Sequence, residues 1–252
     1  MKQTPRTNTP AGGSRRTLLR AAVASGALAG TLALGSAAVP ASASPRPAAP
    51  RPAAPRHRPG TPAQALRELA AGNRRWRSLR QQHPHETAAV REILISGQHP
   101  FAVILGCIDS RVPPELVLDQ GLGDLMTVRS AGEVLDEAVL GSVAYGVLDL
   151  DIPLVMVLGH QSCGAVTAAV HAEETGEELP AHIQYIADRI RPAIDHSQQG
   201  PARIDSTITR NVGMVTDHLR REPDLAARIT AGKLTVVGAR YELTSQRVHL
   251  VA

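Results

Sequence analysis

Two short apolar segments, each followed directly by chemically reactive side chains, constrain this chain more than any other feature. The first reads FAVILGCIDSR over residues 101–111, and the second reads LVMVLGHQSCGAV over residues 154–166. Each is a run of aliphatic residues that ends in a glycine, which is typical of a strand buried on both faces of a parallel sheet. Open α/β sheets place their ligands at the carboxyl ends of such strands. We therefore expect the side chains that follow the two strands to share one site.

The order of the expected elements indicates an α/β fold. Strands are predicted over residues 101–106, 125–128 and 154–158, and helices over 113–118, 134–148 and 164–171. Strands that alternate with helices require right-handed crossovers, which give a mainly parallel central sheet flanked by helices. Aromatic residues make up only 2% of the chain, so the core must consist mainly of Val, Ile, Leu and Ala.

Further elements are expected before and after this region. Thr61 is a suitable N-cap for a helix that starts at Pro62. The other expected elements are a helix over 86–96, a loop over 171–180, and helices over 181–194 and 205–229. A polar turn at residues 244–246 separates two β-rich segments, which predicts a hairpin that adds edge strands. The predicted fold thus has an N-terminal helical arm and a C-terminal edge hairpin.

The first 43 residues have the features of an export signal. Paired arginines, Arg15 and Arg16, are followed by leucines and by a weakly apolar stretch over residues 21–39. Small residues before and at Ala43 suit cleavage after that position. The arginine pair resembles a twin-arginine signal, so we expect residues 1–43 to be removed and the protein to be exported by that route. An ordinary secretory signal and a basic disordered tail are the alternatives.

Residues 44–60 are rich in proline and cannot form a core, so we interpret them as a linker before a folded domain at 61–252. Residues 1–60 hold nine of the 27 basic residues and none of the 23 acidic ones. The domain is therefore mildly acidic, with 18 basic against 23 acidic residues, which argues against a nucleic-acid partner. Gly and Ser interrupt the stretch 21–39, so no stable membrane span is expected in the mature protein.

Two cysteines and a histidine follow the apolar segments. Cys107 comes directly after the first segment, and His160 and Cys163 come after the second. Two thiolates and one imidazole form a known zinc-binding set that leaves one coordination position open for catalysis. In an exported protein the two cysteines could instead form a disulfide, and the residue pattern alone leaves both interpretations open.

Asp109 and Arg111 lie beside Cys107 in the same segment. A carboxylate and a guanidinium at this spacing can form a bidentate pair that projects to one side of the site. The pair belongs either to the chemistry of the site or only to the ordering of its loop.

At these residues the sequence resembles the β-class carbonic anhydrases. Residues 107–111 read CIDSR, which matches the family's C-x-D-S-R motif, and residues 160–164 read HQSCG, which matches its H-x-x-C-G motif. The agreement extends over nearly the whole folded domain, through segments such as GLGDLMTVRSAGEV and VVGARYEL. The resemblance implies zinc-dependent, reversible hydration of CO₂ to bicarbonate and a proton by a zinc-bound hydroxide.

The resemblance also implies roles for particular residues. Cys107, His160 and Cys163 would bind one Zn²⁺ per subunit, and Asp109 and Arg111 would form the catalytic dyad. The implied substrate-binding positions are Gln98, Gly164 and Tyr145. Tyr145 is expected to come from a neighbouring subunit, with packing in a dimer core as its alternative role. The assembly implied is a homodimer or a dimer of dimers.

Three other functions are alternatives. A CS₂ or COS hydrolase on the same scaffold would use the same ligand set, and access to the pocket would distinguish it. A thiol oxidoreductase usually needs two closely spaced cysteines, whereas 55 residues separate Cys107 from Cys163. A disulfide-stabilised secreted binding protein would not bind zinc.

Overall fold

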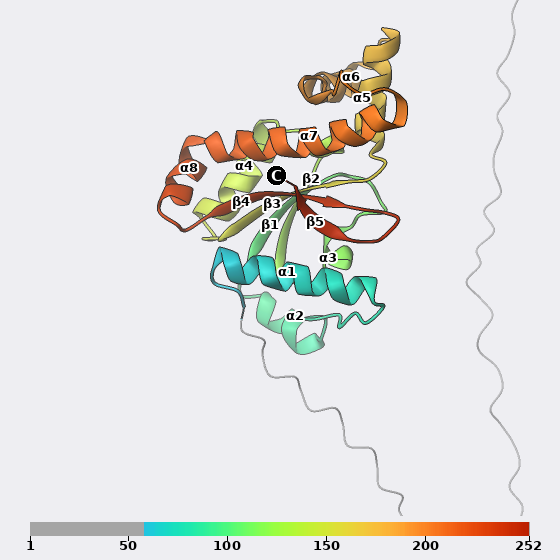
Figure 1. Cartoon of the computed structure of the whole chain (residues 1–252). Helices are drawn as coiled ribbons and strands as arrows, with labels where there is room; N and C mark the ends of the chain where they lie inside the picture. Colours follow the sequence, from blue (N-terminus) through green and yellow to red (C-terminus); the bar gives the residue numbers. More distant parts are fainter. Residues whose placement is uncertain (1–57, 252) are drawn as a thin grey trace, which may run out of the picture. The chain divides into compact units, whose positions relative to one another are not determined.

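A five-stranded sheet runs through the centre of residues 58–251, the part of the chain that this computed structural model describes (Figure 1). In spatial order its strands are β2 (Leu125–Arg129), β1 (Ala102–Gly106), β3 (Leu154–His160), β4 (Thr235–Tyr241) and β5 (Val248–Val251). The first four strands are parallel, and β5 pairs antiparallel with β4. The predicted α/β class is confirmed, although β4 lies inside the sheet and only β5 forms the edge at this side.

The strands β1 and β3 lie in the interior of the sheet, and every residue in them is buried. Val103 and Leu105 belong to one core cluster, whereas Ala102 and Ile104 belong to another. Burial on both faces explains why these segments show continuous apolar runs in the sequence. Each fully buried Val, Leu or Ile side chain stabilises the fold by about 1.5–3 kcal/mol relative to an exposed one.

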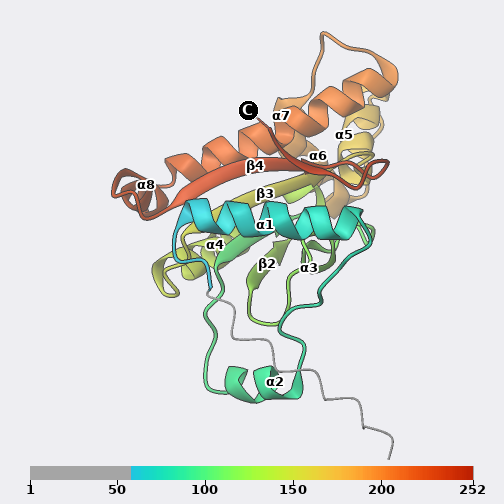
Figure 2. The same ribbon diagram turned by 60° about the horizontal axis from the view of Figure 1, so that its bottom comes forward.

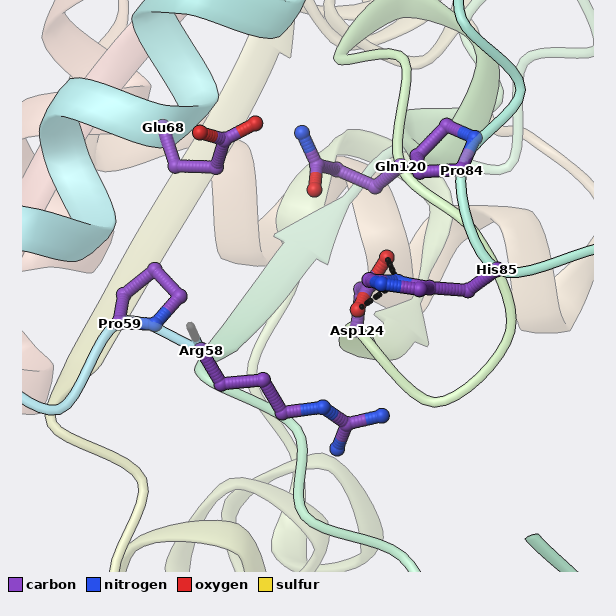
Figure 3. A pocket seen from close by; sticks show the side chains of 7 residues that line it. All are labelled: Arg58, Pro59, Glu68, Pro84, His85, Gln120 and Asp124. Atoms are coloured by element: carbon purple, nitrogen blue, oxygen red, sulfur yellow. Dashed lines mark hydrogen bonds and ion pairs between the residues drawn. The ribbon is translucent and has the colours of Figure 1, made fainter. Parts of the chain in front are cut away.

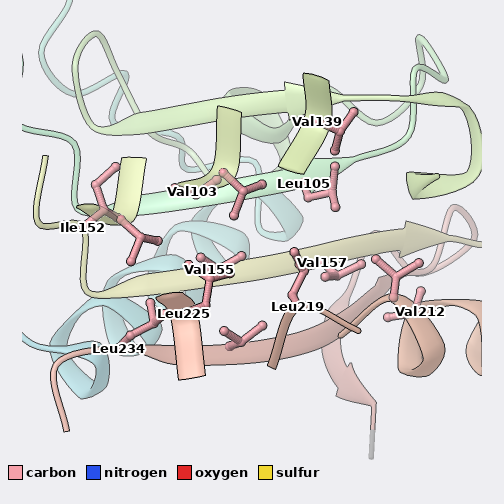
Figure 4. Packing of buried hydrophobic residues seen from close by; sticks show 14 residues of the cluster. Val103, Leu105, Val139, Ile152, Val155, Val157, Val212, Leu219, Leu225 and Leu234 are labelled. Carbon is pink, nitrogen blue, oxygen red and sulfur yellow. The ribbon is translucent and has the colours of Figure 1, made fainter. Parts of the chain in front are cut away.

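Helices cover both faces of this sheet, as Figures 1 and 2 show. The helices are α1 (Pro62–Arg77), α2 (Ala88–Leu94), α3 (Pro114–Val117), α4 (Glu137–Leu148), α5 (Gly164–Thr175), α6 (Ala181–Ile190), α7 (Gly200–Arg221) and α8 (Pro223–Thr230). Aliphatic side chains from α4, α7 and α8 meet those of the strands in one core (Figure 4). Helices α1 and α3 pack on the other face. Helix α5 begins just beyond the end of β3 and packs against α6.

The first helix starts as its sequence predicts. The Thr61 hydroxyl accepts a hydrogen bond from the Gln64 N–H at 3.3 Å, and Pro62 occupies the first helical position. Leu69 is buried against the sheet. The second helical segment is shorter than expected and has no buried residue.

Two predicted helix boundaries were wrong for local reasons. Helix α4 begins at Glu137, because the Asp136 carboxylate accepts a hydrogen bond from the Val139 N–H at 2.8 Å and caps the helix there. Residues 131–133 before it form a short 3₁₀ turn. Helix α5 extends into the expected acidic loop and ends at Thr175, followed by the C-cap residue Gly176, whose positive φ of 70° is favourable there.

The predicted helix over 205–229 is two helices. The chain leaves the helical conformation at Glu222, where α7 ends, and α8 begins at Pro223. Proline has no amide donor and suits the first turn of a helix better than its interior. Helix α7 also begins earlier than expected, at Gly200. The predicted helix over 181–194 is α6 followed by a 3₁₀ turn at 191–193.

The predicted export signal at 1–43, and residues 44–57 of the predicted linker, lie outside the described residues. Within residues 58–251, no helix is both long enough and apolar enough to cross a bilayer.

Candidate metal centre

Three side chains with metal-binding atoms meet at the carboxyl end of the sheet. Cys107 directly follows β1, His160 is the last residue of β3, and Cys163 is the N-cap residue of α5. Because β1 and β3 are adjacent parallel strands, their carboxyl ends lie side by side. The ligand atoms of the three residues all lie within 4.8 Å of one another, and all three residues are buried. The structure therefore brings together the three residues that the motifs predicted.

A tight turn carries the chain from His160 to Cys163. Ser162 adopts a positive φ of 56°, which is uncommon for a residue other than glycine. The Gln161 N–H donates to the Tyr241 carbonyl at 2.9 Å and so extends the pairing of β3 with β4. This turn lets one short segment contribute two donor atoms to the centre.

The two sulfur atoms lie 3.9 Å apart, and both cysteines are free. The His160 Nδ1 is 2.9 Å from the Gln161 carbonyl, a contact that requires the hydrogen to be on Nδ1. This tautomer leaves the lone pair of Nε2 available, and Nε2 is buried without a hydrogen-bond partner. An unpaired buried polar atom is costly, so its presence here points to a ligand that the side chains alone do not supply.

The electrostatics of the cluster favour an ionised sulfur at Cys107. A hydrogen bond from the Cys163 thiol lowers the pKa of Cys107 to about 4, with further help from His160 and from the Gly132 N–H, although burial opposes this shift. The same hydrogen bond and burial raise the pKa of Cys163. Burial works against a charge on His160, but its interaction with Cys107 gives a net rise in the histidine pKa. The protein alone thus favours a thiolate at Cys107 beside a neutral Cys163, and a cation bound at the cluster would favour ionisation of both sulfurs.

Asp109 and Arg111 form the predicted bidentate pair. The Arg111 Nε and Nη2 groups donate to Asp109 Oδ1 at 2.9 Å and Oδ2 at 2.7 Å, and the Arg111 backbone N–H also donates to Oδ1 at 2.9 Å. These hydrogen bonds from Arg111 lower the pKa of Asp109 to about 2. Oδ2 lies 3.9 Å from His160 Nε2, so the carboxylate stands beside the cluster without belonging to it.

A cavity of about 360 Å³ opens beside the cluster. Cys107 and Asp109 form part of its wall, and its other lining is mostly apolar and comes from Ile108, α5 and α6. Gly164 also lines it, and a Cβ atom added at Gly164 would meet nothing within 4 Å. The predicted position of Gly164 at the pocket agrees with this geometry.

Gln98 and Tyr145 do not line this cavity. Gln98 is exposed and precedes β1, so it lies at the opposite end of a strand about 16 Å long. Tyr145 projects from α4 with 49% of its surface exposed. Within one chain, the structure does not bring these two residues to the centre.

A second hollow lies where the parallel strands begin (Figure 3). Its volume is about 30 Å³, which is enough for roughly one water molecule. The His85 Nδ1 lies 2.8 and 2.7 Å from the two carboxylate oxygens of Asp124, whose side chain is 2% exposed. Asp124 also accepts from the Gly121 N–H at 2.9 Å. The polar groups of this pair satisfy each other and require no ligand.

The sequence interpretation missed the segment that supports Cys107. The Ser130 N–H donates to the Gly106 carbonyl at 3.1 Å, and the Gly132 N–H donates to the Cys107 sulfur at 3.4 Å. Gly132 has a φ of 62°, and a Cβ atom there would lie 2.7 Å from Ile190 Cδ1. The SAG residues at 130–132 could have indicated a turn here, but they carry no information about its contacts.

Glu133 was also missed. It is 2% exposed, and its Oε1 has no hydrogen-bond partner. Burial raises its pKa well above the usual range, and the negative charge of Cys107 raises it further. Its place between a glycine and a valine gave no sign that this acid is buried.

The chain was compared with known proteins. The sequence profile of the family "Carbonic anhydrase" matches residues 102–248. Carbonic anhydrase 2 of Mycobacterium tuberculosis is 41% identical over 191 residues, which cover 75% of this chain and 92% of that protein. A carbonic anhydrase of Mycolicibacterium smegmatis is 40% identical, with 75% and 93% covered.

Solved structures share the fold. The β-carbonic anhydrase CcaA aligns with a TM-score of 0.60 at 24% identity, over 73% of this chain and 94% of that one. The tetrameric β-carbonic anhydrases of Sordaria macrospora align with a TM-score of 0.60 at 20% identity, over 74% and 96%. The profile match and the bacterial relatives show the family, and the chain belongs to the β-class carbonic anhydrases, enzymes that hydrate CO₂.

Proposed function

We propose that Cys107, His160 and Cys163 hold one Zn²⁺ per subunit and that this centre hydrates CO₂ reversibly to bicarbonate and a proton. The observation that carries the proposal is the distance of 3.9 Å between the two sulfur atoms. Two sulfurs bound tetrahedrally to zinc at about 2.3 Å each would lie about 3.8 Å apart. Sulfurs in a disulfide are only about 2.05 Å apart. The free lone pair of His160 Nε2 supplies the third donor.

Zinc, when bound, acts as a Lewis acid that lowers the pKa of a water molecule, so that hydroxide is available near neutral pH. The remaining work belongs to the protein. Asp109 accepts a hydrogen bond from the attacking nucleophile and orients its lone pair toward CO₂. Arg111 keeps this carboxylate ionised and in position through two side-chain hydrogen bonds.

The cavity fits the substrate. CO₂ is small, uncharged and apolar, and the walls contributed by α5 and α6 are mostly apolar. Apolar walls also lower the local polarity beside Asp109, which strengthens its electrostatic effect. A charged substrate would need basic groups, and no lysine, arginine or histidine lines this cavity within the described chain.

The site is completed by a second subunit in this proposal. Tyr145 and Gln98 are exposed and lie away from the centre of their own chain, so a partner subunit would present them to it. Helix α2 has no buried residue, and Ile93 and Ile95 near its end are 69% and 86% exposed, as expected for an arm that packs on a partner. The tetramers of Sordaria macrospora support a homodimer or a dimer of dimers.

Export by the twin-arginine route belongs to the same proposal. That route carries folded proteins, so Cys107 and Cys163 would bind zinc while both are still reduced. N-terminal sequencing of secreted protein should place the cleavage after Ala43. A disulfide between the two cysteines in secreted protein would contradict this order of events.

The decisive experiment is stopped-flow measurement of CO₂ hydration from pH 6.5 to 9, with zinc-loaded, zinc-depleted and reloaded protein. We expect a rate that requires zinc and rises with pH. A background rate in fully zinc-loaded protein would reject CO₂ hydration. The same samples should then be assayed with CS₂ and COS, because a hydrolase for these substrates would use the same centre.

A further inference from the structure

Arg129, the last residue of β2, makes two contacts with the loop that carries the centre. Its Nε donates to the Cys107 carbonyl at 2.8 Å, and its Nη2 donates to the Asp109 carbonyl at 2.7 Å. One guanidinium thus bridges the backbone of a metal-binding residue and that of the carboxylate beside the centre. Within the described chain, these two carbonyls are the groups that hold the Arg129 guanidinium.

The sheet places Arg129 where it can make these contacts. Arg129 pairs in register with Gly106, the residue directly before Cys107. Its neighbours add the Ser130 and Gly132 amide contacts to Gly106 and to the Cys107 sulfur. The loop after β1 is therefore held along its length by the residues that follow β2.

We propose that Arg129 is a positioning residue for the reaction, because it sets the orientation of the 107–109 loop and with it both the Cys107 sulfur and the Asp109 carboxylate. This inference rests on the proposed function. A planar guanidinium with donors in fixed directions can hold two carbonyls at once, whereas a lysine ammonium lacks this fork. Supporting residues of this kind typically change metal affinity or activity by about 10- to 100-fold when they are removed.

The test compares Arg129→Ala with Arg220→Ala. Arg220 is a matched control, because its Nε and Nη2 also donate to a backbone carbonyl, that of Val236, far along the sheet from the centre. We expect Arg129→Ala to lose zinc to a colorimetric chelator about 10-fold faster or more and to lower kcat about 10- to 100-fold. KM should change less than kcat, because Arg129 does not line the cavity. Arg220→Ala should retain the wild-type zinc release and kcat.

Two further measurements separate positioning from general stability. Free guanidinium, well below denaturing concentrations, should restore part of the activity of Arg129→Ala, because Arg129 is exposed and leaves an accessible space. It should not stimulate the wild type. Arg129→Lys keeps the charge and should recover at most part of the activity. It also serves as the test protein if Arg129→Ala fails to fold.

The outcomes distinguish the two proposals. Wild-type zinc release and kcat in Arg129→Ala, or equal losses in Arg220→Ala, would overturn the role of Arg129 and leave the proposed function intact. Full activity in Arg129→Lys would overturn it as well. A wild type that binds zinc but does not hydrate CO₂ would reject the proposed function, while the zinc-release comparison would still test whether Arg129 positions the loop. A wild type that binds no zinc would overturn both.

Discussion

Each end of the parallel sheet holds a histidine close to an aspartate. The two ends differ in whether these side chains satisfy their hydrogen-bonding groups within the protein. At the end where the strands begin, His85 and Asp124 bind each other at 2.7 and 2.8 Å beside a hollow of about 30 Å³. At the carboxyl end, Asp109 is bound to Arg111, and His160 keeps a buried nitrogen without a partner beside a cavity of about 360 Å³. The presence of a histidine and an aspartate does not by itself separate the two ends.

The difference shows that a buried polar group marks a binding site only when the fold leaves it unsatisfied. His85 and Asp124 satisfy each other, so their pair stabilises the contact between two loops. His160 Nε2 lies 3.9 Å from Asp109 Oδ2, beyond hydrogen-bond distance, while Arg111 holds both oxygens of that carboxylate. The parallel strands then bring two cysteine sulfurs to the free nitrogen.

The largest expected effect on zinc binding and activity comes from replacing one of the two histidines by alanine. His160→Ala should lose bound zinc and reduce CO₂ hydration to the background rate, because it removes one of three ligands. His85→Ala should retain zinc and turnover but lower the free energy of unfolding by about 1–3 kcal/mol, because it removes the imidazole partner of the buried Asp124, which then keeps the Gly121 N–H. Zinc analysis, stopped-flow assay and urea unfolding measure these effects. Loss of zinc in both variants would show that the two ends are not independent.

The next largest expected effect is on kcat and comes from replacing an aspartate by asparagine. Asp109→Asn should retain zinc but lower kcat by about 10²- to 10⁴-fold, because an amide cannot accept and orient the nucleophile's hydrogen bond in the same way. Asp124→Asn is the control at the other end and should affect stability without changing kcat. Near-normal turnover in Asp109→Asn would remove that residue from the mechanism.

A smaller effect concerns stability at acidic pH. The pKa of Asp109 is lowered to about 2 by Arg111, from a usual value of about 3.9 in unfolded chains. A depressed pKa stabilises the fold above the unfolded value, and this contribution is lost as the pH falls through about 2. Urea unfolding of wild type and Asp109→Asn between pH 2 and 6 should therefore show their difference shrinking below about pH 4. A difference independent of pH would mean that Arg111 does not hold the carboxylate ionised.

The smallest expected effect is that of Gly164→Ala, and a glycine at the other end provides the contrast. Gly164→Ala adds a methyl group to the open cavity, so the free energy of unfolding should change by less than about 0.5 kcal/mol, with a modest rise in KM. Gly121→Ala, at the other end, would place its Cβ 1.7 Å from the Pro84 carbonyl oxygen and should destabilise the protein strongly. Thermal unfolding and KM measurements on both variants would reveal the contrast. A strongly destabilised Gly164→Ala would show that this wall is not open.

The features predicted well from the sequence depend on neighbouring residues. The apolar runs that became β1 and β3, the cap at Thr61 and the Asp109 and Arg111 pair all lie within a few residues of the signal that indicates them. Predicted helix ends were less accurate, because a single cap such as Asp136 or a single break at Pro223 decides them. The predicted signal and linker depend on residues outside the described part of the chain.

The sequence by itself determined the α/β class, the family and the prediction that Cys107, His160 and Cys163 share one site, because each is encoded in short, contiguous patterns. Only the tertiary structure decided which polar groups are satisfied. In the sequence, Arg129 lies 20 and 22 positions from the two residues whose carbonyls it contacts, and the two cysteines lie 56 positions apart. The pairing of strands sets such distances, and no local pattern contains them. For this reason the sequence could propose the ligands, while the fold alone showed that a free histidine nitrogen stands beside two free thiols and that an arginine from the neighbouring strand holds their loop.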